Sequence, residues 1–150
     1  MWSGLHMQGC RSLDIYSVSM DTVLPLPLAE SGISAGFPSP AQDYLDLAID
    51  LNKELIRNPS STFYARVKGE SMQGAGIDHG DLLVVDRSVS PSNGKIAVCF
   101  IDGEFTVKRI KTDVNCCWLM PENPTYQPIR VTESNQFLVW GVVIYLIKAV

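Results

Sequence analysis

The stretch Val67–Met72 reads VKGESM and joins an alternating apolar segment to a serine in a glycine-rich loop. The residues before it, Thr62–Val67, alternate in the way that a half-buried strand requires. The residues after it, up to His79, are irregular and rich in glycine. The stretch therefore predicts the end of a strand, Thr62–Val67, followed by a turn that presents the hydroxyl of Ser71.

Short strands are predicted along most of the chain that follows. The apolar segments are bounded by turn residues, among which Asn93-Gly94 is a turn signal and Asp102-Gly103 a tight hairpin. The predicted strands are Asp81–Asp86, Lys95–Ile101, Glu104–Ile110, Cys116–Met120, Ile129–Val131 and Phe137–Ile147. Gly141 indicates a bulge in the last of these. With Thr62–Val67, about seven short strands predict a mostly-β domain.

The first part of the chain has a different character. Residues 1–35 are predicted to form a flexible N-terminal arm, in which the alternating prolines of Val23–Leu28 favour an extended conformation. Residues 36–150 form the predicted folded domain. Ser39 as N-cap predicts a short helix through Leu47, and a second helical turn is predicted over Leu51–Ile56, ended by Asn58-Pro59.

Composition excludes several classes of protein. The 150 residues are 46% hydrophobic and 19% charged, which suits one globular domain with a tail. The net charge of −4 argues against direct binding to DNA, because such binding uses a basic face. No apolar run approaches the length of a membrane span, and the N-terminus lacks the pattern of a signal peptide. We therefore expect a cytoplasmic protein that binds neither membrane nor specific DNA.

The cysteines and histidines do not predict a metal site. Cys10, Cys99, Cys116 and Cys117 contain no CxxC spacing, and the two histidines lie far apart in the sequence. Zinc sites use closely spaced ligand pairs, so we expect no metal and no cofactor. The cysteines are interpreted as reduced thiols, some of them buried as small apolar groups.

A lysine in the predicted strand Glu104–Ile110 could activate Ser71. A serine hydroxyl is a weak nucleophile until a base removes its proton. Lysine can do this if burial lowers its pKa from the usual ~10.4 towards neutrality. Along Thr106–Ile110, period 2 places Lys108 on one face with Thr106 and Ile110, and no acidic residue within this stretch shares that face. Ser71 and Lys108 are therefore a candidate nucleophile and general base.

Two further features complete the candidate site. Backbone N–H groups at Glu70 and Ser71 could form an oxyanion hole, which stabilises the negative charge of acyl transfer. The bond between Ala35 and Gly36 lies in a run of small residues that a narrow cleft could accept. Together they predict a Ser–Lys peptidase that cuts its own arm. His79 lies near Ser71 in the sequence and leaves a Ser–His–Asp triad as an alternative.

Four blocks of sequence resemble one family in their order and spacing. They are Ala35–Pro40 (AGFPSP), Gly69–Met72 (GESM), Gly80–Asp86 (GDLLVVD) and Asp102–Lys108 (DGEFTVK). This pattern resembles the LexA-like self-cleaving serine peptidases, and within them the accessory subunits of error-prone translesion DNA polymerases.

The resemblance implies a fold, a site and partners. It implies a LexA- and signal-peptidase-like domain of short, highly curved strands, with Ser71 as nucleophile, Lys108 as general base and Ala35-Gly36 as the cleaved bond. It implies self-cleavage stimulated by the RecA–single-stranded-DNA filament in the SOS response. It also implies that the shortened product forms a homodimer and binds the catalytic subunit of a translesion polymerase. No helix-turn-helix fits before residue 35, which separates the chain from the repressors of this family.

Two other functions stay open at this point. The first is a non-catalytic, dimeric, polymerase-binding module, which the long apolar strand Phe137–Ile147 would favour if it lay at an exposed sheet edge. The second is a signal-peptidase-like enzyme, which would also use a serine–methionine motif and a lysine base. The internal position of Ala35-Gly36 and the lack of a membrane anchor argue against the second.

Overall fold

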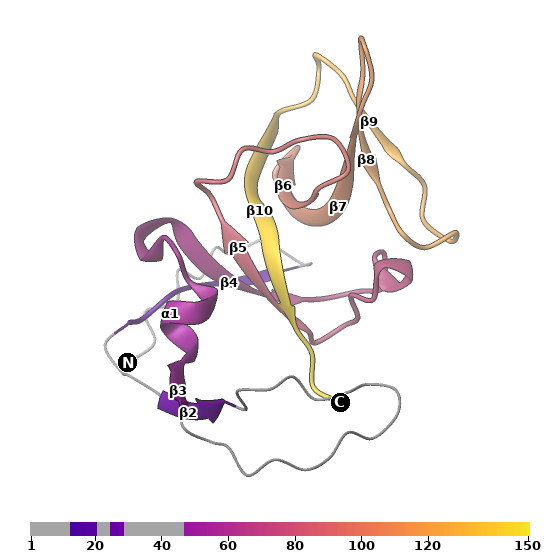
Figure 1. Cartoon of the computed structure of the whole chain (residues 1–150). Coiled ribbons are helices and arrows are strands. Elements are labelled where there is room, and N and C mark those ends of the chain that lie inside the picture. Colours follow the sequence, from indigo (N-terminus) through magenta and orange to yellow (C-terminus); the bar gives the residue numbers. More distant parts are fainter. Residues whose placement is uncertain (1–12, 21–24, 29–46) are drawn as a thin grey trace. The chain divides into compact units, whose positions relative to one another are not determined.

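The structure is a computed structural model in which residues 13–20, 25–28 and 47–150 are described (Figure 1). The chain divides into two compact units, one formed by residues 1–18 and 60–150 and the other by residues 19–59. The larger unit carries Ser71 and Lys108. None of the helices among the described residues is long and apolar enough to cross a membrane.

The larger unit is built on one antiparallel sheet. Among the described residues the sheet has eight strands in the order β1-β4-β5-β10-β6-β7-β8-β9. Their bounds are β1 Leu13–Ser17, β4 Thr62–Val67, β5 Leu82–Asp86, β6 Ile96–Ile101, β7 Glu104–Thr112, β8 Cys117–Met120, β9 Ile129–Val131 and β10 Phe137–Ile147. The predicted mostly-β domain of short strands is confirmed, and the bounds of β4, β9 and β10 agree with the prediction.

The strand β10 lies in the middle of the sheet. It pairs with β5 along its second half and with β6 along its first half (Figure 1). Phe137–Ile147 is therefore not an edge strand of the sheet, contrary to what its length had suggested, although among the described strands each of its halves is paired on one side. A length of eleven residues lets this strand pair with two others that are each about half as long.

A bulge occurs at Gly141, as its position in the sequence predicts. The register of β10 against β6 shifts between Val139 and Gly141, and its register against β5 shifts between Val143 and Tyr145. A Cβ at residue 141 would lie 2.6 Å from Cγ1 of Val85, which is fully buried. Glycine is thus required here by the close approach of β5 to the bulge.

Two groups of buried side chains form the core. The first lies around β4, β5 and β7 and includes Met72, Leu83 and Phe105. The second lies between β6, β7 and β8 and includes Cys99 and Leu119. Because β7 contributes Val107 to the first and Ile110 to the second, the strand that carries Lys108 is held on both faces.

The hairpin between β6 and β7 sets the position of Lys108. Asp102 and Gly103 both have positive φ (47° and 87°), as a two-residue hairpin of this twist requires. In the resulting register Cys99 lies opposite Thr106, and Ala97 lies opposite Lys108. The predicted tight turn is confirmed.

The N-terminal end of the larger unit adds one strand. Leu13–Ser17 falls within the segment predicted as an arm, and as β1 it pairs with β4 from Leu13↔Val67 to Ser17↔Phe63. Sequence alone left residues 1–20 without an assigned structure. Ile15 of this strand packs against the first core group.

The smaller unit contains a two-stranded sheet and a short helix. Strand β2 (Pro25–Leu28) pairs with β3 (Leu47–Asp50), and α1 (Leu51–Leu55) follows directly. The predicted extension of a helix through Leu47 is wrong, since Leu47 is in β3. Asp50 caps α1 by accepting a hydrogen bond from the Asn52 N–H, which confirms the second predicted helical turn.

Candidate active site

Ser71 lies in a turn that its neighbour Met72 anchors in the core. Met72 is 2% exposed and belongs to the first core group. Its carbonyl accepts hydrogen bonds from the N–H groups of Ala75 (3.0 Å) and Ile77 (3.2 Å) around the 3-10 turn Gln73–Ala75. The buried Met72 therefore fixes the turn to the core, while Ser71 itself is half-buried.

Lys108 lies at the centre of β7 and reaches the hydroxyl of Ser71. Its Nζ is 2.9 Å from Ser71 Oγ, 2.7 Å from Thr106 Oγ1 and 3.0 Å from the carbonyl oxygen of Val107. The lysine is 6% exposed. The structure thus brings together the two side chains that the sequence selected, at a distance suited to proton transfer.

Burial lowers the pKa of the Lys108 ammonium below its ordinary value. A nearby thiolate would oppose this effect, and Cys99 lies opposite Thr106 on the adjacent strand. Burial, however, raises the pKa of the Cys99 thiol to about 12, so this group is neutral at physiological pH. Desolvation is therefore the effect that decides the protonation of Lys108, and it favours the neutral amine.

The loop before β5 is hydrogen-bonded to the segment that leads from β4 to Ser71. The N–H of Val67 donates to the Asp81 carbonyl (2.9 Å), and the N–H of Gly80 donates to the Val67 carbonyl (2.8 Å). The N–H of Gly69, at φ 93°, donates to Nδ1 of His79 (3.1 Å). These bonds continue the β4 pairing to the start of the Ser71 turn.

His79 has a different place from the one that a catalytic triad requires. It is exposed, and its Nδ1 accepts the Gly69 N–H. In the part of the chain that the structure describes, the side-chain partner of the Ser71 hydroxyl is Lys108 and not an imidazole. The geometry thus favours the Ser–Lys pair over the Ser–His–Asp alternative.

A segment after β8 holds the Ser71 turn on the other side. The N–H of Glu122 donates to the Ser71 carbonyl (2.8 Å), and the Glu122 carbonyl accepts the Gly74 N–H (2.6 Å). The Asn123 side-chain amide donates to the Glu70 carbonyl (2.8 Å). We refer to Pro121–Asn123 as the 121–123 segment.

A small hollow opens beside the two candidate catalytic groups. It is lined by Val67, Lys68, Gly69, Ser71, Met72, Thr106 and Val107. The N–H groups of Glu70 and Ser71 belong to the turn at its rim, and their role as an oxyanion hole stays a prediction. Ala35 and Gly36, the predicted cleavage site, lie outside the described residues, as does Cys10.

Sequence reasoning placed Thr106 on the face of Lys108 but gave it no role at the site. It missed two other residues, Glu122 and Asn123. These two gave no such signal, because they reach Ser71 only through the folding of β8 against β7. Within the described ranges, no group of three or more His, Cys, Asp or Glu side chains could hold a metal ion.

Comparison with known proteins agrees with this geometry. The Peptidase S24-like family matches residues 27–144, and the chain belongs to this family. It is thereby a serine endopeptidase of the LexA-like, self-cleaving type.

The similar proteins indicate a narrower group within the family. The chain is 42% identical to Protein ImpA of Salmonella typhimurium over 127 residues, which cover 81% of this chain and 82% of that protein. It is 42% identical to Protein MucA of Escherichia coli over 133 residues, 87% of this chain and 90% of that protein. A LexA repressor of Acidithiobacillus ferrooxidans is 34% identical over 92% of this chain and 67% of its own length. ImpA and MucA are UmuD-like proteins, and UmuD is the accessory subunit of an error-prone translesion polymerase, so the predicted likeness to this group is confirmed.

Proposed function

We propose that this protein cuts its own chain between Ala35 and Gly36, with Ser71 as nucleophile and Lys108 as general base. The observation that carries the proposal is the 2.9 Å contact between Lys108 Nζ and Ser71 Oγ, made by a lysine that is 6% exposed. A lysine in water would be charged at neutral pH and could not accept a proton. Burial removes that obstacle, because it lowers the pKa of this amine.

The neighbours of Lys108 orient the amine for this reaction. A neutral amine has two N–H donors and one lone pair. The carbonyl of Val107 can only accept, and Thr106 Oγ1 lies at 2.7 Å as a second acceptor. With both N–H groups engaged there, the lone pair is directed at the third neighbour, the O–H of Ser71.

The reaction then follows the pattern of acyl transfer. Lys108 takes the hydroxyl proton as Ser71 Oγ attacks the Ala35 carbonyl carbon, giving a tetrahedral oxyanion. N–H groups of Glu70 and Ser71 stabilise that oxyanion. The ammonium of Lys108 returns its proton to the Gly36 nitrogen as the peptide bond breaks. Water, deprotonated by the same amine, hydrolyses the Ala35 ester and frees Ser71.

The test is self-cleavage of the purified chain at alkaline pH, where more of the amine is neutral. Wild type should release a fragment whose mass begins at Gly36, and Ser71→Ala and Lys108→Ala should stay intact. Lys108→Arg is a sharper variant, because a guanidinium keeps its charge and cannot act as base. A Lys108→Arg chain that cuts as fast as wild type would refute the role of the lysine.

We further propose that cleavage responds to DNA damage. Support comes from the likeness to ImpA, MucA and SamA, the last being 44% identical over 74% of this chain. On this proposal a RecA–single-stranded-DNA filament stimulates cutting in the cytoplasm. The shortened chain then forms a homodimer and binds the catalytic subunit of an error-prone translesion polymerase.

Two measurements separate this proposal from a purely binding function. Activated filament should raise the rate of cutting for wild type, while Ser71→Ala stays uncut in its presence. The chain that starts at Gly36 should bind the polymerase subunit better than uncut Ser71→Ala does. Equal binding by both forms would instead favour a module in which the Ser–Lys pair is dispensable.

A further inference from the structure

The 121–123 segment links the turn that contains Ser71 to strand β7, which contains Lys108. Its main-chain bonds hold Ser71 and Gly74 through Glu122, and its Asn123 amide holds Glu70. These bonds lie on both sides of the Ser71 residue along the chain. A displacement of Glu122 would therefore move the turn that presents the hydroxyl.

The side chain of Glu122 is held by Arg109. Arg109 Nε donates to Glu122 Oε1, and the two form an ion pair. The same guanidinium donates through Nη1 to the Gly94 carbonyl (2.7 Å), in the turn before β6. Arg109 is the residue after Lys108, and successive residues of a strand face opposite sides. Its position on β7 is therefore set by the same backbone that positions the base.

We propose that Arg109 is a positioning residue for self-cleavage, which acts through Glu122 to fix Ser71 at the correct distance from Lys108. The inference rests on the proposed function of the Ser71–Lys108 pair. The chain of contacts runs from the β7 backbone to the guanidinium, to the Glu122 carboxylate, and from the Glu122 N–H to the Ser71 carbonyl. Each contact is polar and directional, so together they define the separation between nucleophile and base.

The ion pair should affect the rate more than the stability. The two side chains are 37% and 33% exposed, and pairs at such positions contribute little to the free energy of folding. Catalysis is more sensitive, because a misplacement of ~1 Å can lower a rate by about 10²-fold. A variant can therefore stay folded and still cut slowly.

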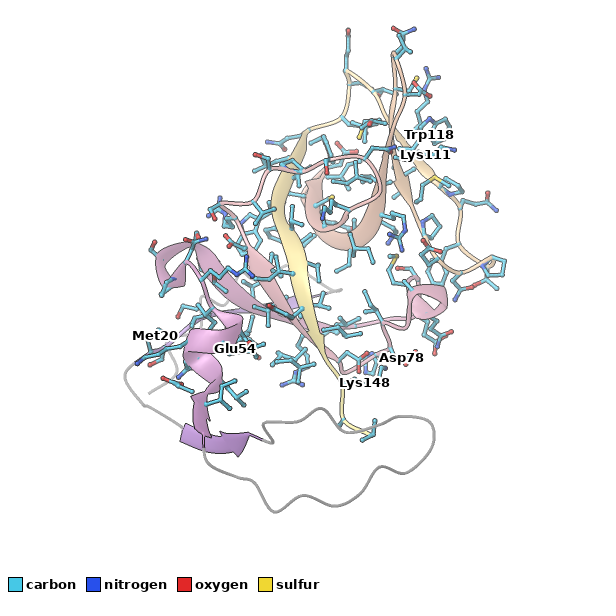
Figure 2. All side chains as sticks on the ribbon, in the orientation of Figure 1. Met20, Glu54, Asp78, Lys111, Trp118 and Lys148 are labelled. Atoms are coloured by element: carbon cyan, nitrogen blue, oxygen red, sulfur yellow. The ribbon has the colours of Figure 1, made fainter. Side chains whose placement is uncertain are left out.

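The experiment measures self-cleavage of the full chain across alkaline pH for Arg109→Met and Glu122→Gln. We expect both to lower the plateau rate by roughly 10-fold without moving the pH at which the rate is half its plateau. The exchanged double variant, Arg109→Glu with Glu122→Arg, should recover part of the rate. Lys111→Met is the matched control, since Lys111 is exposed and lies two residues further along β7, opposite Trp118 (Figure 2). It should cut within about twofold of wild type.

The outcomes separate the inference from its alternatives. A plateau for Arg109→Met equal to that of Lys111→Met would overturn it. A changed pH midpoint with an unchanged plateau would also overturn it, because that result means that Arg109 acts on the charge of Lys108 and not on position. Urea unfolding shows whether Arg109→Met is misfolded. If it is, the plateau rate of folded Glu122→Gln decides whether the inference holds. If wild type and Lys111→Met both fail to cut while folded, the proposed function itself fails and this inference with it.

Discussion

Replacing Gly74 with alanine should show what the close contact between residue 74 and Glu122 contributes to the site, without a change in backbone conformation. The glycines at 69, 76, 80, 94 and 103 have positive φ, but Gly74 is not among them, so its backbone suits any residue. What Gly74 lacks is space. A Cβ there would lie 2.5 Å from the Glu122 carbonyl oxygen and 3.3 Å from its carbon.

The size of the effect follows from these distances. An ordinary contact needs at least 3.4 Å, so the Glu122 carbonyl must retreat by about 0.9 Å. That movement breaks or weakens two hydrogen bonds, Gly74 N–H to Glu122 O and Glu122 N–H to Ser71 O. At about 0.5–1.5 kcal/mol each, the loss is roughly 1–3 kcal/mol. Reduced freedom of the unfolded chain offsets about 0.4–1 kcal/mol of it.

The assay combines stability and rate. Urea unfolding of Gly74→Ala, made together with Ser71→Ala so that no chain is cut, should show a loss of about 1–2 kcal/mol. Self-cleavage of Gly74→Ala alone should be slower by about 10²-fold, because Ser71 moves with Glu122. Gln73→Ala is the control, since Gln73 is exposed in the same 3-10 turn.

A Gly74→Ala chain with the stability and cleavage rate of Gln73→Ala would refute the reasoning. It would mean that the 121–123 segment moves away without disturbing Ser71. A loss of stability with an unchanged cleavage rate would also refute the reasoning, because it would mean that the contact between residue 74 and Glu122 does not position Ser71.

Three further predictions concern protonation. The rate of self-cleavage should rise by up to tenfold for each pH unit. It should level off at a pH below the pKa of an ordinary lysine, because burial lowers the pKa of Lys108. His79→Asn, which keeps an acceptor for the Gly69 N–H, should cut within about twofold of wild type, whereas loss of a catalytic histidine would lower the rate by about 10⁶-fold. Lys148→Met should lower stability at neutral pH, since Lys148 pairs with Asp78 and Asp81 near the end of the chain (Figure 2). The pKa of Asp81 is lowered and that of Lys148 raised. The difference from wild type in urea unfolding should therefore be greatest between about pH 4 and pH 10, shrinking at lower pH as Asp81 is protonated and at higher pH as Lys148 loses its charge.

Much of the larger unit could be predicted from local patterns. Alternation in Thr62–Val67 and the positive-φ turn at Asp102-Gly103 depend on residues that are neighbours in the chain, so their strands were placed correctly. The same alternation put Thr106 and Lys108 on one face. The bulge at Gly141 could also be predicted from a single residue, although the close approach of β5 that requires glycine there is a contact between distant segments.

Other features were set by contacts between distant segments. The composition of Phe137–Ile147 is compatible with an edge or a central strand, and the pairing with both β5 and β6 decided between them. Residue 47 lies in a strand and not a helix because β2 offers its backbone a partner, which outweighs local helix propensity.

The sequence by itself selected Ser71 and Lys108 as the candidate nucleophile and base, since motif order and strand period depend only on the chain. Tertiary structure alone decided that their side chains meet at 2.9 Å and that the lysine is buried. It also decided that Glu122 is bonded both to Ser71 and to Arg109. The physical reason is that desolvation and hydrogen-bond geometry are properties of a place in space. Residues far apart in the chain create that place together, and no local pattern of residues encodes it.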